Sequence, residues 1–254
     1  MAPAPPAARL AAMILAAGRG ERMRPLTDHT PKPLLTAGGK PLIVHQIEAL
    51  RRAGIIDIVI NAAHRAERLV TSLGDGHAFG VRITWSIESE PLETAGGIAT
   101  AYPLLGSGIV AVLSGDIHTD FDYASLLPRA ARMAADPASP RVHLVMVPNP
   151  PYHPTGDFAL IDGRIRDDEA APRLTFGNIA LYDRVLFAEL PRGVKLKLLP
   201  FFKTWIAAGI VSGELHSGRW ANVGTPADLA LLDAALGATP GPSGGTIAPP
   251  STLS

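Results

Sequence analysis

Apolar residues gather in short runs that alternate with helix-like stretches from residue 10 to about residue 148. Several runs are continuously apolar, as strands covered on both faces are. The predicted strands are Ala11–Leu15, Ile56–Ile60, Val81–Ile87, Ile109–Leu113 and Val142–Val147. The predicted helices are a segment from Pro41 to Gly54, then Ala66–Leu73, Thr94–Leu105 and Tyr123–Ala135. This alternation predicts an α/β, Rossmann-like three-layer sandwich with a mostly parallel central sheet.

The pattern changes after residue 148. Asp162-Gly163 is a strong turn signal, and it predicts a hairpin between Phe158–Ile161 and Arg164–Arg166. The remaining predicted elements are strands at Leu174–Leu181, Val211–Leu215 and Arg219–Val223, and helices at Leu198–Ala208 and Ala227–Leu236. The last helix follows a capping box, Thr225-Pro226-Ala227-Asp228. We expect a single domain over 10–237, between a proline-rich disordered tail at 1–9 and a second disordered tail at 238–254 in which Gly, Pro, Ser and Thr dominate.

Composition excludes several classes of protein. The 254 residues hold 23 Lys+Arg and 23 Asp+Glu, so the formal net charge is zero and nothing predicts nucleic-acid binding. The chain has no cysteine, which excludes disulfides and thiolate metal sites. No apolar run approaches the roughly 20 residues that span a bilayer. The proline-rich start is a poor signal peptide, so we expect a cytoplasmic protein with no membrane partner.

The loop after the first predicted strand carries the strongest chemical signal. It runs from Leu15 to Leu34 and is rich in small residues at its start, which let a ligand approach the backbone. It is not a Walker A motif, and it lacks the third glycine of the dinucleotide fingerprint. Exposed amides at such a turn can still hold phosphate oxygens. Arg24 can grip two oxygens at once, and Lys32 acts as a point charge.

Asp116 ends a second apolar run, Ile109–Leu113, through Ser114-Gly115. A phosphate-binding loop together with a carboxylate at the carboxyl end of a strand is what a magnesium-dependent reaction on a nucleotide requires. The eight histidines show no ligand spacing with one another, so we predict no histidine metal site.

Leu-Ala-Ala-Gly-x-Gly-x-Arg-Met-x-Pro-Leu-Thr, followed by Pro-Lys-Pro-Leu, resembles the sugar-1-phosphate nucleotidyltransferases over roughly residues 10–236. The resemblance implies the nucleotidyltransferase fold, and it implies a role for each matching residue. Lys32 would contact the α-phosphate and Asp116 would bind Mg²⁺. The remaining implied nucleotide-binding residues are Ala16, Ala17, Gly18, Gly20 and Arg24.

The second metal ligand implied by the resemblance lies in Trp220-Ala221-Asn222-Val223-Gly224-Thr225, where the family has an aspartate and this chain has Asn222. An asparagine carbonyl oxygen can bind magnesium without adding charge. A structural interpretation of Asn222 as a turn residue also remains open.

Glu90–Gly97 matches a third segment of the family, and Glu93 stands where glycine is common. This variant is most similar to the uridylyltransferases that act on N-acetylmuramate 1-phosphate in peptidoglycan recycling, although Ala95 departs from that subgroup. The resemblance implies that Glu93, Thr94 and Asp157 contact the sugar. Glu93 can alternatively be read as a carboxylate that favours a helix N-terminus.

The implied reaction joins a sugar 1-phosphate to the α-phosphorus of a nucleoside triphosphate, UTP by preference, and releases pyrophosphate. Two alternatives stay open. One is a mannose- or heptose-1-phosphate guanylyltransferase that uses GTP, and the other is a non-catalytic protein that senses nucleotides. The sequence gives no oligomeric state.

Overall fold

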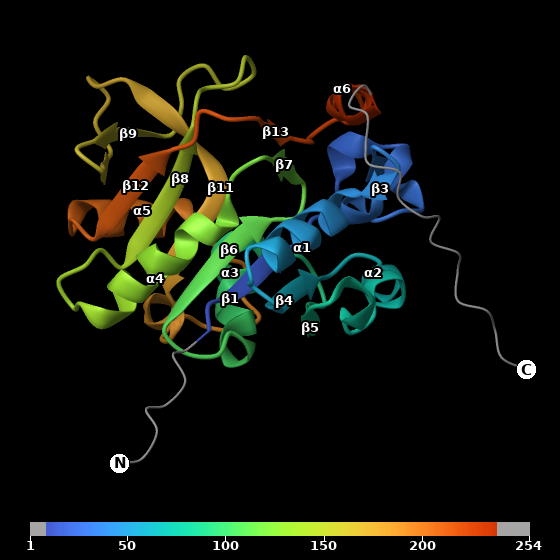
Figure 1. Ribbon diagram of the computed structural model, residues 1–254, viewed down its shortest axis with the longest axis horizontal. Helices are drawn as coiled ribbons and strands as arrows, with labels where there is room; N and C mark the ends of the chain where they lie inside the picture. The colour runs from blue at the N-terminus through green and yellow to red at the C-terminus, as the bar shows by residue number, and fades with distance from the viewer. Residues whose placement is uncertain (1–8, 238–254) are drawn as a thin grey trace, which may run out of the picture.

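The computed structural model describes residues 9–237 (Figure 1). The segments 1–8 and 238–254, which hold the predicted tails apart from Arg9, lie outside the described residues. A nine-stranded sheet forms the centre, in the order β5-β4-β1-β6-β11-β8-β12-β10-β9. Its strands are β1 (Ala11–Leu15), β4 (Asp57–Ala62), β5 (Arg82–Ile87), β6 (Ile109–Ser114), β8 (Val142–Val147), β9 (Phe158–Ile161), β10 (Arg164–Arg166), β11 (Arg173–Asp183) and β12 (Val211–Leu215).

Most strands of this sheet run in one direction. β5, β4, β1 and β6 pair in parallel, and so do β8 and β12. β11 is antiparallel to both of its neighbours, β6 and β8, and β10 is antiparallel to β12 and β9. The register of β11 shifts between Phe176 and Ala180, where Asn178 adopts a left-handed φ of 57°.

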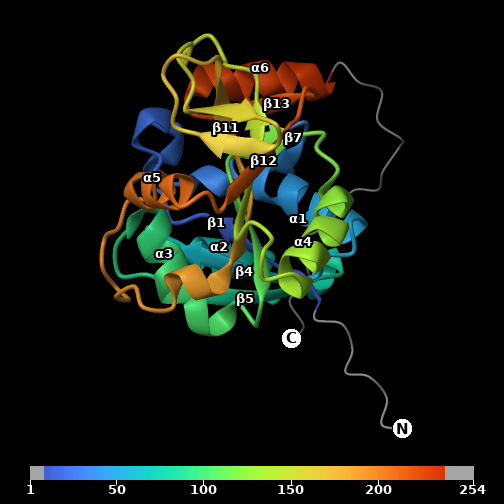
Figure 2. The same cartoon turned by 90° about the vertical axis from the view of Figure 1, so that its left-hand side faces the viewer.

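Helices cover both faces of the sheet. They are α1 (Leu42–Arg52), α2 (Ala66–Leu73), α3 (Glu93–Ala101), α4 (Leu126–Ala135), α5 (Leu199–Ala207) and α6 (Pro226–Gly237). Figure 2 shows α3 and α5 on one side of the sheet and α1 and α4 on the other. An apolar core lies on each face of the sheet, and alternate residues of β1 point into one or the other. Ala12 and Ile14 pack with α1, α2 and α4, and Met13 packs with α3 and α5. The predicted three-layer α/β sandwich is therefore confirmed.

Two small sheets lie outside the main one. β2 (Thr36–Ala37) pairs with β3 (Lys40–Pro41), and β7 (Ile117–Thr119) pairs with β13 (Trp220–Asn222). α6 packs against the first small sheet around a third apolar cluster that includes Met23, Leu42 and Val223. The predicted capping box forms, since the Asp228 amide lies 3.2 Å from Thr225 Oγ1 and the Thr225 amide 2.8 Å from Asp228 Oδ2.

Two predicted helices are shorter than the apolar pattern suggested. α3 ends at Ala101, and Tyr102–Leu104 forms a separate 3-10 turn that contains Pro103, which has no N–H to continue the helix. Likewise Tyr123–Ser125 is a 3-10 turn before α4, with the Asp122 side chain accepting the Ala124 amide at 3.0 Å. No helix among residues 9–237 has the length and apolarity needed to cross a membrane.

Candidate active site

The loop after β1 and the turn after β6 meet at one edge of the sheet. β1 and β6 pair in parallel, with Leu15 opposite Ser114 at their carboxyl ends. The Gly115 amide donates to the Leu15 carbonyl at 2.9 Å. A Cβ at Gly115 would lie only 3.2 Å from that oxygen, so glycine permits the close approach. Asp116 is thereby placed directly beside the loop.

Lys32 and Asp116 are in contact. The Lys32 Nζ lies 2.6 Å from Asp116 Oδ2, and the two side chains are 11% and 29% exposed. Lys32 begins a 3-10 turn, η3 (Lys32–Leu34), between two prolines. The structure thus brings together the two predicted residues that are 84 positions apart in the chain.

Gly20 shapes the loop around Lys32. Its φ is 64°, in the left-handed region, and a Cβ there would lie 3.0 Å from Thr27 Cγ2 and 3.1 Å from Lys32 Cβ. The Thr27 hydroxyl donates to the Gly20 carbonyl at 2.9 Å, which closes the loop. The result is a cavity of about 340 Å³ lined by Gly18, Arg19, Gly20, Glu21, Arg22, Lys32, Asp116 and Gly224. We call it the loop cavity.

The arginine in the loop cavity is Arg22, together with Arg19, and not the predicted Arg24. The side chain of Arg24 is 70% exposed, and its Nε lies 3.5 Å from Asp28 Oδ1. Met23, which lies between Arg22 and Arg24 in the sequence, is fully buried in the third apolar cluster. It anchors the 3-10 turn η1 (Glu21–Met23) there. The sequence motif already contained the signal, because it fixes arginine at position 22 and leaves position 24 open.

A buried polar chain ties the loop to the start of α3. The Ala16 amide donates to Asn61 Oδ1 at 2.8 Å, and Asn61 Nδ2 donates to Glu88 Oε1 at 2.7 Å. The other Glu88 oxygen accepts the Leu92 amide at 3.2 Å. Burial raises the pKa of the Glu88 carboxyl, and these two hydrogen bonds oppose the shift. The backbone amide of Ala16 is therefore already engaged, whereas Ala17 and Gly18 continue into the loop.

Asn222 and Asp116 lie on neighbouring segments. β13 pairs antiparallel with β7, Asn222 stands opposite Ile117, and the Val223 amide donates to the Asp116 carbonyl at 2.9 Å. Among residues 9–237 no group of three or more His, Cys, Asp or Glu could hold a metal ion. The potential metal ligands at this place are the carboxylate of Asp116 and the amide oxygen of Asn222. This set fits a hard cation that takes its other oxygen ligands from a triphosphate.

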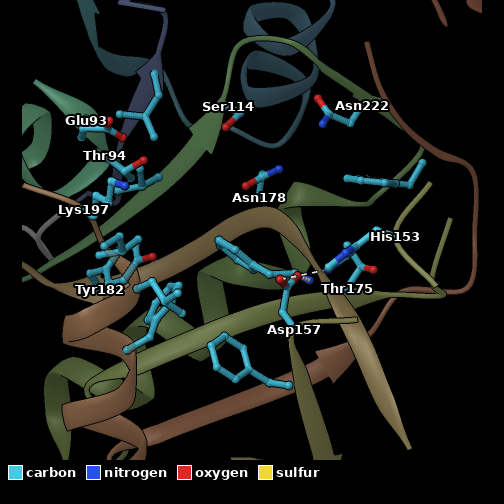
Figure 3. A pocket seen from close by; sticks show the side chains of 18 of the residues that line it. Glu93, Thr94, Ser114, His153, Asp157, Thr175, Asn178, Tyr182, Lys197 and Asn222 are labelled. Atoms are coloured by element: carbon cyan, nitrogen blue, oxygen red, sulfur yellow. Dashed lines mark hydrogen bonds and ion pairs between the residues drawn. The ribbon is translucent and has the colours of Figure 1, made fainter. Parts of the chain in front are cut away.

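A second, larger cavity of about 580 Å³ opens beside the first, and we call it the acceptor cavity. All three residues predicted to contact a sugar, Glu93, Thr94 and Asp157, line it. Its other lining residues are Leu15, Val112, Ser114, Tyr152, His153, Phe158, Thr175, Phe176, Asn178, Tyr182, Lys197, Leu198, Leu199, Phe202, Trp220 and Asn222. Figure 3 shows Glu93, Thr94 and Lys197 on one side of this cavity, and Asn222 and His153 on the other.

Two of the residues predicted to contact the sugar, Glu93 and Asp157, are constrained by the backbone conformation or by hydrogen bonds. Glu93 opens α3 with a φ of 62°, a left-handed conformation that explains why glycine is common there. Asp157 accepts the Phe176 amide at 2.8 Å and lies 3.1 Å from His153 Nε2 (dashed in Figure 3). Asp157 therefore also holds the 150–157 loop against β11.

Sequence reasoning missed several lining residues of the acceptor cavity. Asn178 comes from the irregular part of β11, and Lys197 from the segment before α5. Their only sequence signals were the place of Asn178 within the predicted strand Leu174–Leu181 and the place of Lys197 just before the predicted helix Leu198–Ala208. Neither signal points to a cavity.

Comparison with known proteins places the chain in a family. The Nucleotidyl transferase family matches residues 11–153. N-acetylmuramate alpha-1-phosphate uridylyltransferase of Neisseria meningitidis serogroup B is 44% identical over 230 residues, which cover 89% of this chain and 98% of that protein. Mannose-1-phosphate guanyltransferase of Schizosaccharomyces pombe is 34% identical over 85% of this chain, which spans 61% of that protein.

Among solved structures, a provisionally assigned glucose-1-phosphate thymidylyltransferase from Bacillus anthracis, solved in complex with sucrose, superposes with a TM-score of 0.79. It is 22% identical and covers 92% of this chain and 98% of its own, so it supports the fold alone. The family match covers more than half of the sequence and includes every lining residue of the loop cavity except Gly224. The chain therefore belongs to the Nucleotidyl transferase family, and it is a nucleotidyltransferase.

Proposed function

We propose that this protein transfers the uridylyl group of UTP to N-acetylmuramate 1-phosphate, in a magnesium-dependent reaction that serves cytoplasmic peptidoglycan recycling. The relative that is 44% identical carries this acceptor and this activity in its name, and this chain covers 98% of its length. A second uridylyltransferase of the same name, from Caulobacter vibrioides, is 36% identical over 89% of this chain.

The observation that carries the proposal is that the same three segments line both cavities. The segments that follow β1, β6 and β13 contribute Gly18, Asp116 and Gly224 to the loop cavity. The last residues of the same three strands, Leu15, Ser114 and Asn222, line the acceptor cavity. A triphosphate in the loop cavity and a sugar phosphate in the acceptor cavity would therefore meet at this edge of the sheet.

The chemistry needs alignment and positive charge. A phosphate oxygen of the sugar 1-phosphate forms a bond to the α-phosphorus of UTP, and the bond from that phosphorus to the β-phosphate bridge breaks, so pyrophosphate leaves. The attacking monoester has a second pKa of about 6 and is already largely dianionic at pH 7, so no general base is required. Repulsion between two anions is the main barrier. Lys32, Arg22 and Arg19 would offset it.

Asp116 and Asn222 would hold Mg²⁺ through a carboxylate and an amide oxygen. The ion, when bound, supplies positive charge to the triphosphate. Thr94 and Glu93, at the start of α3, would bind the sugar, and the aromatic wall formed by Phe158, Phe176 and Phe202 would face its apolar groups. Ala17 and Gly18 would lie against the nucleoside.

The test is a pyrophosphate-release panel with four nucleotides, UTP, GTP, dTTP and CTP, against several sugar 1-phosphates, each with and without Mg²⁺. We expect activity with UTP and N-acetylmuramate 1-phosphate. Preference for GTP with mannose 1-phosphate would instead favour the guanyltransferases, of which one is 42% identical over 85% of this chain. Nucleotide binding without turnover of any pair would point to the non-catalytic alternative.

A further inference from the structure

Lys197 differs from the other lysines of this protein. The chain has five lysines, all within the described residues. Four form ion pairs with carboxylates: Lys32 with Asp116, Lys40 with Glu48, Lys195 with Glu90, and Lys203 with Asp167. Lys197 forms no ion pair with any residue of the described part, 9–237, yet it lines the acceptor cavity. An ammonium group at a cavity wall without a carboxylate partner is placed to receive an anionic group of a ligand.

The backbone around Lys197 is held firmly. The Leu196 amide donates to the Leu92 carbonyl at 3.0 Å, and the Leu196 carbonyl accepts the Ala95 amide at 3.0 Å. Gly96 allows this close packing, because a Cβ there would collide with the Val194 carbonyl oxygen. Leu198, the next residue, is buried against the α5 side of the core. The segment that carries Lys197 is thus fixed to the N-terminal end of α3.

The position of Lys197 within the cavity separates it from the reacting end. Asp116 and Asn222 belong to segments that the two cavities share, and in Figure 3 Lys197 and Asn222 lie on opposite sides of the view. A sugar 1-phosphate must turn its phosphate toward the shared segments. Its more distant substituents then lie toward Thr94 and Lys197. The anion that Lys197 faces is therefore a group of the sugar other than the 1-phosphate.

The other charged groups of the cavity support this assignment. Two carboxylates line the cavity. Asp157 is already engaged by His153 and by the Phe176 amide, and Glu93, on the same side of the cavity as Lys197 in Figure 3, forms no ion pair with it. Tyr182, Leu198 and Phe202 give the wall near α5 an apolar character, and Lys197 itself is exposed, so its ammonium group is accessible to a ligand that enters the cavity.

We propose that Lys197 determines acceptor specificity by pairing with the carboxylate of the 3-O-lactyl ether of N-acetylmuramate 1-phosphate. The inference rests on the proposed function and adds to it the residue that distinguishes this acceptor from N-acetylglucosamine 1-phosphate. The two acceptors share the phosphate, the ring and the acetamido group, and only the first carries a lactyl carboxylate. Lys197 is thus a specificity-determining residue that makes no contact with the reacting phosphorus.

The experiment compares kcat/KM for these two acceptors with UTP, in the wild type, Lys197→Gln and Lys197→Arg. We expect Lys197→Gln to lower kcat/KM for N-acetylmuramate 1-phosphate by roughly 10- to 100-fold, as loss of a hydrogen bond to a charged group does. The slower reaction with N-acetylglucosamine 1-phosphate, and the KM for UTP, should stay within about twofold, and Lys197→Arg should recover most of the lost rate. Lys203→Gln is the control, because Lys203 pairs with Asp167 and does not line the cavity.

An equal loss with both acceptors would overturn the inference, because it would mean that Lys197 binds the shared phosphate or supports the fold. An unchanged preference would overturn it as well. Failure of the wild type to use N-acetylmuramate 1-phosphate with UTP would refute the proposed function and this inference together. That result is visible before any variant is measured, so the two failures are distinguishable.

Discussion

The ammonium group of Lys32 lies 2.6 Å from the carboxylate of Asp116, and the two residues arrive there from separate turns at the carboxyl edge of the sheet. Only 11% of the Lys32 side chain is exposed. A cation fixed in this way needs no rearrangement when charge develops on a phosphate, which is the condition under which electrostatic stabilisation is most effective.

Lys32→Ala should therefore lower kcat by roughly 10²–10³-fold, as removal of one preorganised donor does elsewhere. The measurement is steady-state pyrophosphate release with saturating UTP and acceptor. Lys40→Ala is the matched control, because Lys40 also pairs with a carboxylate, Glu48, at 2.6 Å but lines neither cavity. Full turnover by Lys32→Ala, with UTP still tightly bound, would remove Lys32 from the reacting centre.

Arg22 and Arg24 offer a second matched pair. Arg22→Ala should raise the KM for UTP by roughly 10-fold or more, because a charge-assisted contact to phosphate is lost. Arg24→Ala should change it by no more than about twofold, since Arg24 forms only an exposed ion pair with Asp28. The reverse order of effects would show that Arg24 swings into the loop cavity when the nucleotide binds.

The two arginines also show where sequence reasoning stops. The apolar runs predicted β1 and β8 to the residue, and the Asp162-Gly163 turn signal did the same for β9 and β10 on either side of it. The same pattern cannot say which side of a 3-10 turn faces a cavity. Burial of Met23 decides that question, and it depends on a cluster completed by Val223 and Leu232 some 200 positions later in the chain.

The acceptor cavity was only partly predictable for a similar reason. Glu93 and Thr94 stand in a motif, whereas Asn178 and Lys197 reach the cavity through a strand irregularity and through a segment packed on α3. Strands of two or three residues, such as β2, β3 and β7, are too short to show a period. The sequence pattern does not show which distant segments of the chain pair with one another in the fold.

Asn222 allows the proposed metal site to be tested by adding charge. Asn222→Asp should lower the Mg²⁺ concentration for half-maximal rate by roughly tenfold, equivalent to about 1.4 kcal/mol of added attraction. Asn178→Asp adds the same charge to the acceptor cavity from β11 and should leave the Mg²⁺ requirement unchanged. The readout is initial rate against Mg²⁺ at fixed UTP. If both variants shift the requirement equally, the effect is general electrostatics and Asn222 is not a ligand.

Glu93 combines backbone strain with a proposed sugar contact, and two variants separate them. Glu93→Ala and Glu93→Gly both remove the carboxylate. Of the two new residues, only glycine adopts a φ of 62° without a steric cost. We expect the glycine variant to be more stable than the alanine variant by about 1 kcal/mol in urea unfolding. Both should lose acceptor kcat/KM to a similar degree, roughly 10-fold. Equal stability of the two variants would mean that the left-handed geometry is not retained.

His118 lies on β7, two residues after Asp116, and its surroundings disfavour its charged form. Burial, with the nearby His45 and Arg219, lowers the pKa of His118 from 6.5 to about 4, against a smaller opposing effect of Asp120. The rings of His45 and His118 meet edge to face with centroids 5.1 Å apart. Burial also lowers the pKa values of His45 and His143.

The sign of the resulting pH dependence follows from proton uptake. Above pH 6.5 His118 is neutral in both the folded and the unfolded chain, and between pH 6.5 and 4 mainly the unfolded chain takes up the proton. Acidification from pH 7 to pH 5 should therefore lower the unfolding free energy, with at most about 2 kcal/mol of the loss due to His118. His118→Phe keeps an aromatic ring against His45 and cannot bind a proton. Its unfolding free energy, measured in urea at both pH values, should fall by less than that of the wild type. An identical fall would assign the acid sensitivity to His45, His143 or other groups.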